Sequence, residues 1–393
     1  MALLCLCIAI ALLVVPAAAG TTNVTVTRYC DNNYAVVDIS NNFTYQELMT
    51  IGEYQSNGEV IMQGLVTYDD WVDAGMDPAE FYTEENSGWD PTESVRLSYY
   101  GAHNGTLVED IVEEIGGMPD GSELEVADST YPRATRHFSK TNVYTPTTGQ
   151  GEMVLCWWDS EYGFADTWKK GMRLFFYTPD DLKLSNMDMK EVFAPWYYQF
   201  STDKNNESFS GPSAKGLSVQ TVDTINIYPP HRYDFATGGD TVKYAYEGGV
   251  TGLPTANDVP SATTVDTSKI AANDSVYEQT ASEVNGEYAA QRFVFNVTES
   301  ASNIEKLAFT WDGTSSHDNP NADQGATTYI WKNGTGYETL SGDITSNIGD
   351  YVVNGNVTVL VKQNTAQFED EDENTFLSLL STDYVKLVVT HHH

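Results

Sequence analysis

Basic residues are scarce in this sequence. Its 393 residues include 20 Lys and Arg against 56 Asp and Glu, a formal net charge of −36. Nucleic-acid binding needs clustered Lys and Arg, and docking on anionic lipid needs the same charge. The composition therefore argues against DNA, RNA or a lipid surface as partner. Membrane contact is expected only through an uncleaved N-terminus or an anchor outside this sequence. Hydrophobic residues at 41% and aromatics at 12% still predict packed cores.

Catalytic motifs are also missing. The sequence has no CxxC, no HExxH, no Walker loop and no Gly-x-Ser-x-Gly. Four histidines precede the C-terminal residues, and none stands at metal-ligand spacing from another: His103, His137, His231 and His317. The run His391-His392-His393 resembles a trimmed purification tag and is left out of functional reasoning. We therefore expect no catalytic residues and lean against an enzyme.

The first residues resemble a secretory leader. Ala2 to Val15 is an unbroken apolar run, followed by Pro16 and a small-residue stretch ending at Gly20. This pattern predicts a signal peptide over residues 1–19, cleaved near Ala19. A retained anchor is the alternative, because the run is just long enough to cross about 30 Å of hydrocarbon. An extracellular or cell-surface location follows from either reading.

Only four cysteines are present, and cleavage removes Cys5 and Cys7. The remaining pair, Cys30 and Cys156, is a candidate disulfide in an oxidising compartment. The alternative is two buried free thiols, because Cys156 lies in the apolar run Met153–Trp158.

Glycosylation sequons are frequent, which agrees with export. Asn296 and Asn356 each lie in an alternating segment, where their side chains are expected to face solvent. Eight sequons begin at Asn23, Asn42, Asn104, Asn206, Asn273, Asn296, Asn333 and Asn356.

One polar segment offers oxygen ligands for calcium. Residues 311–325 read as a loop that contains Asp312, Asp318 and Asp323. Oxygen-rich loops can hold Ca²⁺, although this spacing is not that of an EF-hand. A polar loop without an ion is the alternative.

Residues 29–229 mix helix and strand patterns. Thr44 and Glu47 have capping-box spacing and predict a short helix that ends near Gly52. Thr106 and Glu109 repeat the spacing. Five segments read as strands, namely Val60–Leu65, Glu123–Ala127, Met153–Trp158, Met172–Tyr177 and Thr224–Tyr228. An α+β domain is predicted.

Pro229-Pro230 marks the predicted end of that domain. Residues 230–274 read as a linker or edge segment. From 275 to 390 short alternating strands are separated by Asn-Gly and Asp-Gly turns. This pattern predicts an all-β antiparallel sandwich or jelly roll.

The order of motifs in the first half resembles the molybdopterin-binding domain of sulfite-oxidase-type enzymes. The matching segments are Tyr45–Leu48, Leu107–Ile111, Asp128–Tyr131, Gly171–Leu174 and Val222–Ile227. The resemblance implies that fold, with a cysteine thiolate that binds molybdenum at the end of the second strand. The corresponding segment here, residues 61–65, has no cysteine. The resemblance therefore implies the fold without the cofactor, and molybdopterin is not expected.

The second half resembles a β-sandwich module of surface proteins from methane-producing archaea. The similar segments are Tyr288–Phe295, Leu307–Gly313, Tyr329–Trp331 and Thr382–Lys386. Together with the leader, the sequons and the acidic composition, this indicates a secreted or cell-surface archaeal protein. We expect it to bind a ligand, a glycan or an envelope protein without catalysis. The alternatives are an exported molybdopterin oxidoreductase without the cysteine ligand, and a structural envelope component.

Overall fold

The computed structural model describes residues 20–56, 58–82, 88–131, 134–179, 182–237, 239 and 242–393. The predicted signal peptide, residues 1–19, lies outside the described residues. The chain is strand-rich with several sheets, as the sequence indicated. Its contacts divide it into two compact units. Among the described residues, the first unit lies within 20–26, 41–117 and 125–225, and the second lies within 27–40, 118–124 and 226–393.

The helices are short, and all those described except α3 begin with a side-chain cap. They are α1 (Tyr45–Ile51), α2 (Tyr68–Asp73), α3 (Val108–Glu113), α4 (Lys140–Tyr144) and α5 (Asn186–Val192). Single 3₁₀ turns are η2 (Pro195–Tyr197), η3 (Ala214–Leu217), η4 (Thr267–Lys269) and η5 (Ile348–Asp350). Thr44 caps α1 with the predicted box, because its side chain accepts from the Glu47 N–H and Glu47 accepts from the Thr44 N–H.

The first unit is built around a buried strand. That strand is β9 (Glu152–Asp159), which pairs with β6 (His103–Leu107), β10 (Gly163–Phe164) and β11 (Arg173–Tyr177), and β3 (Tyr54–Gln55) pairs with β6. Residues Met153 to Trp157 of β9 are buried on both faces of the sheet, which confirms the prediction for this segment. Helix α3 covers β9 and β6 with Val108, Ile111 and Val112.

Three further sheets contain strands of the first unit. One contains β12 (Lys183–Leu184), β4 (Ile61–Gln63) and β5 (Leu97–Tyr99), and another contains β13 (Phe200–Thr202) and β14 (Ser210–Pro212). A five-stranded sheet has the order β2 (Asn33–Thr44), β1 (Asn23–Cys30), β15 (Thr224–Tyr228), β7 (Glu123–Ala127), β8 (Arg136–Ser139). Strands β7 and β15 have the bounds that the sequence predicted.

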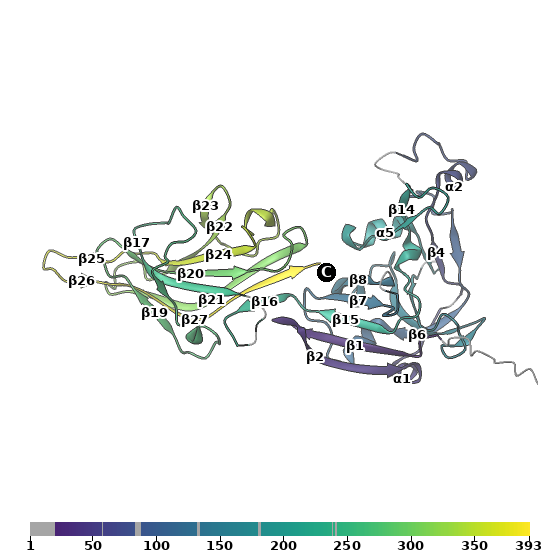
Figure 1. Cartoon of the computed structure of the whole chain (residues 1–393), viewed down its shortest axis with the longest axis horizontal. Helices are drawn as coiled ribbons and strands as arrows, with labels where there is room; N and C mark the ends of the chain where they lie inside the picture. The colour runs from purple at the N-terminus through teal and green to yellow at the C-terminus, as the bar shows by residue number, and fades with distance from the viewer. Residues whose placement is uncertain are drawn as a thin grey trace, which may run out of the picture. The chain divides into compact units, whose positions relative to one another are not determined.

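Two antiparallel sheets form most of the second unit, and their strands can be followed from teal to yellow in Figure 1. One has the order β18 (Thr263–Thr264), β17 (Lys243–Val250), β20 (Tyr288–Asn296), β24 (Asn356–Gln363), β22 (Ala326–Lys332), β23 (Gly336–Thr339). The other has the order β16 (His231–Asp234), β27 (Ser378–His391), β19 (Glu278–Ala281), with β21 (Ile304–His317) also on β27. A hairpin of β25 (Phe368–Glu369) and β26 (Thr375–Phe376) completes the unit.

The two sheets share one hydrophobic core. Phe293, Phe295 and Val359 from the first sheet pack in the same cluster as Leu387 and Val389 from the second. These side chains alternate along their strands with more exposed residues, as in Val385–Val389 of β27. Alternation of period two therefore places one face of each sheet in the core.

Candidate functional site

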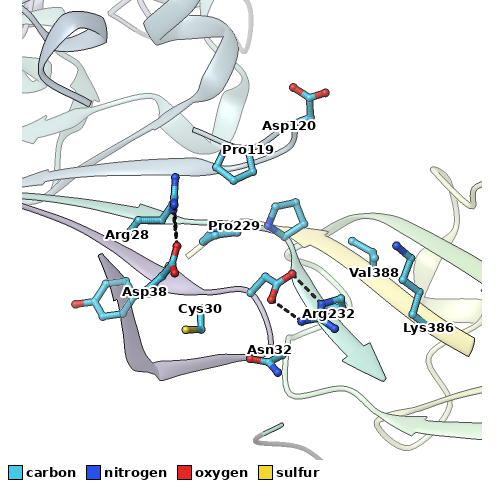
Figure 2. Close-up of a pocket in the computed structure, with 13 residues that line it drawn as sticks. Arg28, Cys30, Asn32, Asp38, Pro119, Asp120, Pro229, Arg232, Lys386 and Val388 are labelled. Carbon is cyan, nitrogen blue, oxygen red and sulfur yellow. Dashed lines mark hydrogen bonds and ion pairs between the residues drawn. The ribbon is translucent and has the colours of Figure 1, made fainter. Parts of the chain in front are cut away.

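An open pocket of about 620 Å³ lies within the second unit. Its walls come from the β1–β2 hairpin, from Pro119 and Asp120, and from strands β16 and β27 (Figure 2). The lining residues are Arg28, Tyr29, Cys30, Asp31, Asn32, Asp38, Pro119, Asp120, Pro229, Pro230, Arg232, Lys386 and Val388. In a chain with 20 basic residues, three of them meet at this pocket.

The hairpin positions the first cation. Strand β1 ends at Cys30, the turn residues are Asp31 and Asn32, and β2 returns from Asn33. Across this hairpin Arg28 binds Asp38, with Nε 2.9 Å and Nη2 2.8 Å from the same carboxylate oxygen. Both side chains are partly exposed, so the pair serves to orient the two groups more than to stabilise the fold.

Arg232 is held by two carboxylates. Its Nε and Nη2 donate to the two oxygens of Asp31, at 2.8 and 3.0 Å, and its Nη1 donates to Asp234. Asp234 also accepts from the Tyr384 hydroxyl at 2.9 Å. The hydrogen bond to Asp31 raises the pKa of Arg232 further. The guanidinium is therefore fixed in place, and Asp31 is oriented at the pocket rim.

Lys386 differs from the two arginines. It lies opposite Asp234 in the register of β16 and β27, and Val388 lies opposite Arg232. Within the part of the chain that the structure describes, the side chain of Lys386 has no hydrogen bond or ion pair. Figure 2 shows Lys386 and Val388 side by side on one face of β27, with no dashed line to the ammonium. The pocket lining thus has two arginines paired with carboxylates, one lysine without a side-chain partner among the described residues, and a further carboxylate at Asp120.

The remaining groups give the pocket its mixed character. Pro119, Pro229, Pro230 and Val388 provide apolar surface, and Asn32 provides an amide. The thiol of Cys30 is partly exposed, and burial together with the carboxylates of Asp38 and Asp31 raises its pKa. A protonated thiol is a weak nucleophile and a weak metal ligand. The Cys30 thiol is therefore not an activated nucleophile.

A second cavity, of about 470 Å³, lies in the first unit at Gly64. Arg96, Lys204 and Lys215 line it, a grouping that the sequence order does not reveal. Lys215 donates to the Ser98 hydroxyl at 3.1 Å, and Arg96 pairs with Asp70 at 2.7 Å.

This cavity has basic groups but no sulfur ligand, so its residues do not fit molybdopterin chemistry. No cysteine lines it. Cys156 is fully buried on β9, 3.2 Å from the Tyr177 hydroxyl, and burial raises the pKa of its thiol to about 12. A thiol in that state cannot supply the soft thiolate that molybdenum needs in such a site.

The predicted disulfide is absent from the structure, where Cys30 and Cys156 are both free thiols. Cys30 ends an edge-proximal strand, β1, and lines the pocket, whereas Cys156 is in the interior of a different sheet. The alternative of a buried free thiol describes Cys156 correctly.

The three aspartates proposed for calcium are not brought together as one ligand group among the residues described. Asp312 lies in β21 and accepts from Asn273, so that this part of the predicted loop is strand paired with β27. Asp318 accepts from the Leu377 N–H at 3.0 Å. Asp323 accepts from the Gly325 N–H at 2.8 Å and from Asn364 at 3.1 Å.

The sequon asparagines differ in exposure. Five are exposed, namely Asn23, Asn42, Asn206, Asn273 and Asn333. Asn104, Asn296 and Asn356 are half-buried. Asn296 and Asn356 are partners across β20 and β24, and Asn296 Nδ2 lies 3.3 Å from Asn356 Oδ1. Glycosylation of these asparagines stays a prediction.

Sequence reasoning missed the pocket, because its charged residues come from three distant segments. The available signs were the Arg-Tyr-Cys-Asp-Asn turn after β1 and His-Arg directly after Pro229-Pro230. Neither segment indicates that Lys386 lines the same pocket.

Comparison with known proteins gives limited similarity. Residues 240–391 match a family described as "Uncharacterized protein, C-terminal domain". No curated protein matches the chain. Among solved structures, the sulfane dehydrogenase SoxCD from Paracoccus pantotrophus is similar over 90% of this chain and 68% of that chain, with 10% identity and a TM-score of 0.28. Similarity at that level does not establish a common fold or activity.

Among the described residues, no helix has the length and apolar character needed to cross a bilayer.

Proposed function

We propose that this chain is an exported, cell-surface archaeal protein that binds a carboxylate-bearing sugar of the envelope and does not catalyse a reaction. The observation that carries the proposal is the pocket of the second unit, where the Lys386 ammonium has no side-chain partner among the described residues and lies beside two arginine–carboxylate pairs. The predicted leader and the sequons support export. The fold expected from the resemblances, a sulfite-oxidase-like α+β domain over 29–229 and a sandwich module over 275–390, belongs to the same proposal.

The charges of the pocket select the ligand class. A net charge of −36 repels anions from most of the surface, so an anionic ligand needs a local cation. Lys386 offers one, and its ammonium can form a charge-assisted hydrogen bond with a carboxylate. The carboxylates of Asp31 and Asp38 can accept hydrogen bonds from sugar hydroxyls, and the Asn32 amide can both donate and accept. Their positions are fixed by Arg232 and Arg28.

The size and apolar content of the pocket agree with a small polar ligand. Its volume of about 620 Å³ falls within the roughly 300–1,000 Å³ typical of small-molecule sites. Prolines and Val388 provide apolar surface for the carbon-bound faces of a sugar ring. Because the site is open, we expect modest affinity, with specificity set by the carboxylate.

The test compares a uronic acid with its neutral counterpart. Calorimetric titration with glucuronate and with methyl glucoside should show glucuronate bound at least about tenfold more tightly, a difference of about 1.4 kcal/mol. Lys386→Gln should remove that preference and leave the weak binding of the neutral sugar. The control is Lys306→Gln, since Lys306 pairs with Asp343 at 3.4 Å and does not line the pocket.

Two results would contradict the proposal: equal affinity for the two sugars, or a preference that survives in Lys386→Gln. The two alternatives predict other observations. Stoichiometric molybdenum in protein from the native host would favour an oxidoreductase. Ordered arrays in cryo-microscopy, without sugar binding, would favour a structural envelope component.

A further inference from the structure

Two histidines and a glutamate that are distant in sequence meet in the second unit. His231 begins β16, Glu299 follows β20, and His391 ends β27. His231 Nδ1 lies 2.5 Å from Glu299 Oε1, and His391 Nε2 lies 3.6 Å from the same oxygen. One donor atom from each residue lies within 4.8 Å of the others, the arrangement of a potential metal centre within the described ranges of the chain.

We propose that His231, Glu299 and His391 bind a divalent transition metal ion, for which zinc is the best match. Two imidazoles and one carboxylate form a donor set that zinc uses in sites with three protein ligands. Imidazole nitrogens favour transition metals over Ca²⁺ and Mg²⁺, which prefer oxygen. Tetrahedral bonds of about 2.0–2.1 Å place donor atoms about 3.3 Å apart, so only small side-chain rotations are required from the present distances.

Neighbouring groups hold the three donors in place, as is usual around bound metals. The Tyr233 hydroxyl donates to Glu299 Oε2 at 2.5 Å and leaves Oε1 facing the histidines. The Thr298 N–H donates to the same hydroxyl at 3.0 Å. His391 Nδ1 lies 3.5 Å from the His392 carbonyl oxygen, and a proton on Nδ1 leaves the lone pair of Nε2 directed to Glu299. Tyr233 is thus a positioning residue for this site.

The three side chains are buried, with exposed fractions of 2% for His231, 5% for Glu299 and 7% for His391. His231 Nδ1 is within hydrogen-bonding distance of Glu299 Oε1, so a metal ion would take the place of the proton between them.

A pocket of about 280 Å³ gives access to the group. Its lining residues are Tyr34, Thr298, Glu299, Ser300, Asn303, His391, His392 and His393. The Tyr34 hydroxyl lies 3.4 Å from His391 Nε2, and it must move slightly when a metal takes that lone pair. Three protein ligands leave a coordination position for water or a small ligand on this side.

His391 lies in a paired strand of the second unit. It is the last residue of β27 and pairs with Ile304 of β21. The family match ends at residue 391, so it includes His391 and excludes His392 and His393. This corrects the sequence-based exclusion of all three histidines from functional reasoning.

The test uses residues 20–393 without any added tag, purified by anion exchange and stripped with a chelator. Titration with Zn²⁺ should show one tight site, and Co²⁺ should give the visible absorption of a four- or five-coordinate centre. Zn²⁺ should raise the melting temperature because it binds only the folded state, whereas Ca²⁺ should not. Glu299→Gln and His231→Gln should each weaken Zn²⁺ binding by at least about tenfold.

Matched variants separate this site from other histidines. The double variant His392→Gln/His393→Gln should keep the zinc affinity and the cobalt spectrum. His317→Gln should do the same, because it removes another buried histidine away from the group. Chelator-treated variants are compared by near-ultraviolet circular dichroism, and if Glu299→Gln does not fold, His391→Asn replaces it.

Three results would overturn the proposal. The first is the absence of a tight zinc site in the wild-type protein. The second is unchanged affinity in folded Glu299→Gln or His391→Asn. The third is loss of the site in the double variant of His392 and His393, which would assign zinc binding to the terminal residues instead.

Discussion

The cysteines show how the environment of one side chain sets its chemistry. Cys156 is fully buried, and burial raises its pKa to about 12. Cys30 is partly exposed at the pocket, and its pKa is raised by burial and by the carboxylates of Asp38 and Asp31, while Arg232 opposes the change. The two thiols should therefore react very differently, although the sequence presents them as an equivalent pair.

We expect a thiol reagent to label Cys30 alone in the native protein. The labelling rate should still be rising at pH 9.0, the ordinary pKa of a thiol, because the pKa of Cys30 is higher than that. The thiolate is the reactive form. Peptide mapping locates the label, and Cys156 should react only after denaturation. Asp38→Asn should accelerate labelling of Cys30 at fixed pH, since it removes a charge that disfavours the thiolate. Equal native labelling of both cysteines would contradict this expectation.

At the scale of elements, short helices depend on their caps. The seven-residue helix α1 is too short to be stable alone, and the reciprocal bonds of Thr44 and Glu47 satisfy its first N–H groups. The Thr44 hydroxyl accepts from the Glu47 N–H at 3.2 Å, and the Thr44 N–H donates to Glu47 at 2.8 Å. The helix then packs on β6. Local hydrogen bonding and tertiary packing therefore act together here.

Thr44→Ala should lower the free energy of unfolding by about 1 kcal/mol, the usual cost of losing an N-cap hydroxyl. Thr44→Ser keeps the hydroxyl and should stay close to wild type. Urea denaturation followed by tryptophan fluorescence is a suitable measurement, because six of the eight tryptophans lie in the first half of the chain. Equal losses in the two variants would show that the cap contributes nothing.

Elements defined by local patterns could be predicted, and those defined by distant contacts could not. The box at Thr44 and the strand Glu123–Ala127 are found as expected. The second predicted box, at Thr106, is wrong. Thr106 lies in β6, and its hydroxyl is 2.9 Å from the carbonyl oxygens of Leu48 and Gly52. α3 instead begins after Leu107 without a side-chain cap. Hydrogen bonds to residues distant in sequence therefore take the place of the predicted capping bond between Thr106 and Glu109.

The same reasoning explains why the candidate sites could not be predicted from the sequence. Asp312, Asp318 and Asp323 are close in sequence and have suitable oxygens, but their carboxylates bind separate partners. Arg28 and Lys386 are far apart in sequence and line one pocket. Residue type predicts which ligand atoms are available. Whether those atoms lie close together depends on strand register and on how the sheets pack.

At the scale of the whole molecule, the dominant property is negative charge. Residues 21–239 carry 13 basic and 34 acidic side chains, and residues 240–390 carry 7 and 22. Both parts are therefore strongly acidic, and the charge is not confined to a tail. Like charges on a compact surface repel one another and oppose folding. Dissolved ions reduce this repulsion, because the Debye length falls from about 30 Å at 0.01 M salt to about 3 Å at 1 M.

Salt should therefore stabilise the folded chain. Raising NaCl from about 0.01 M to 1 M should raise the melting temperature by on the order of 5 °C, which corresponds to about 1–2 kcal/mol for domains of this size. Most of the gain should come below about 0.15 M, where the Debye length has already shortened to about 8 Å. Sucrose at equal osmolarity is the control, because it is excluded from the protein surface but does not screen charges. A melting temperature that is flat or falls with NaCl would mean that attractive ion pairs, such as Arg28–Asp38 and Arg232–Asp31, outweigh the repulsion among the other carboxylates.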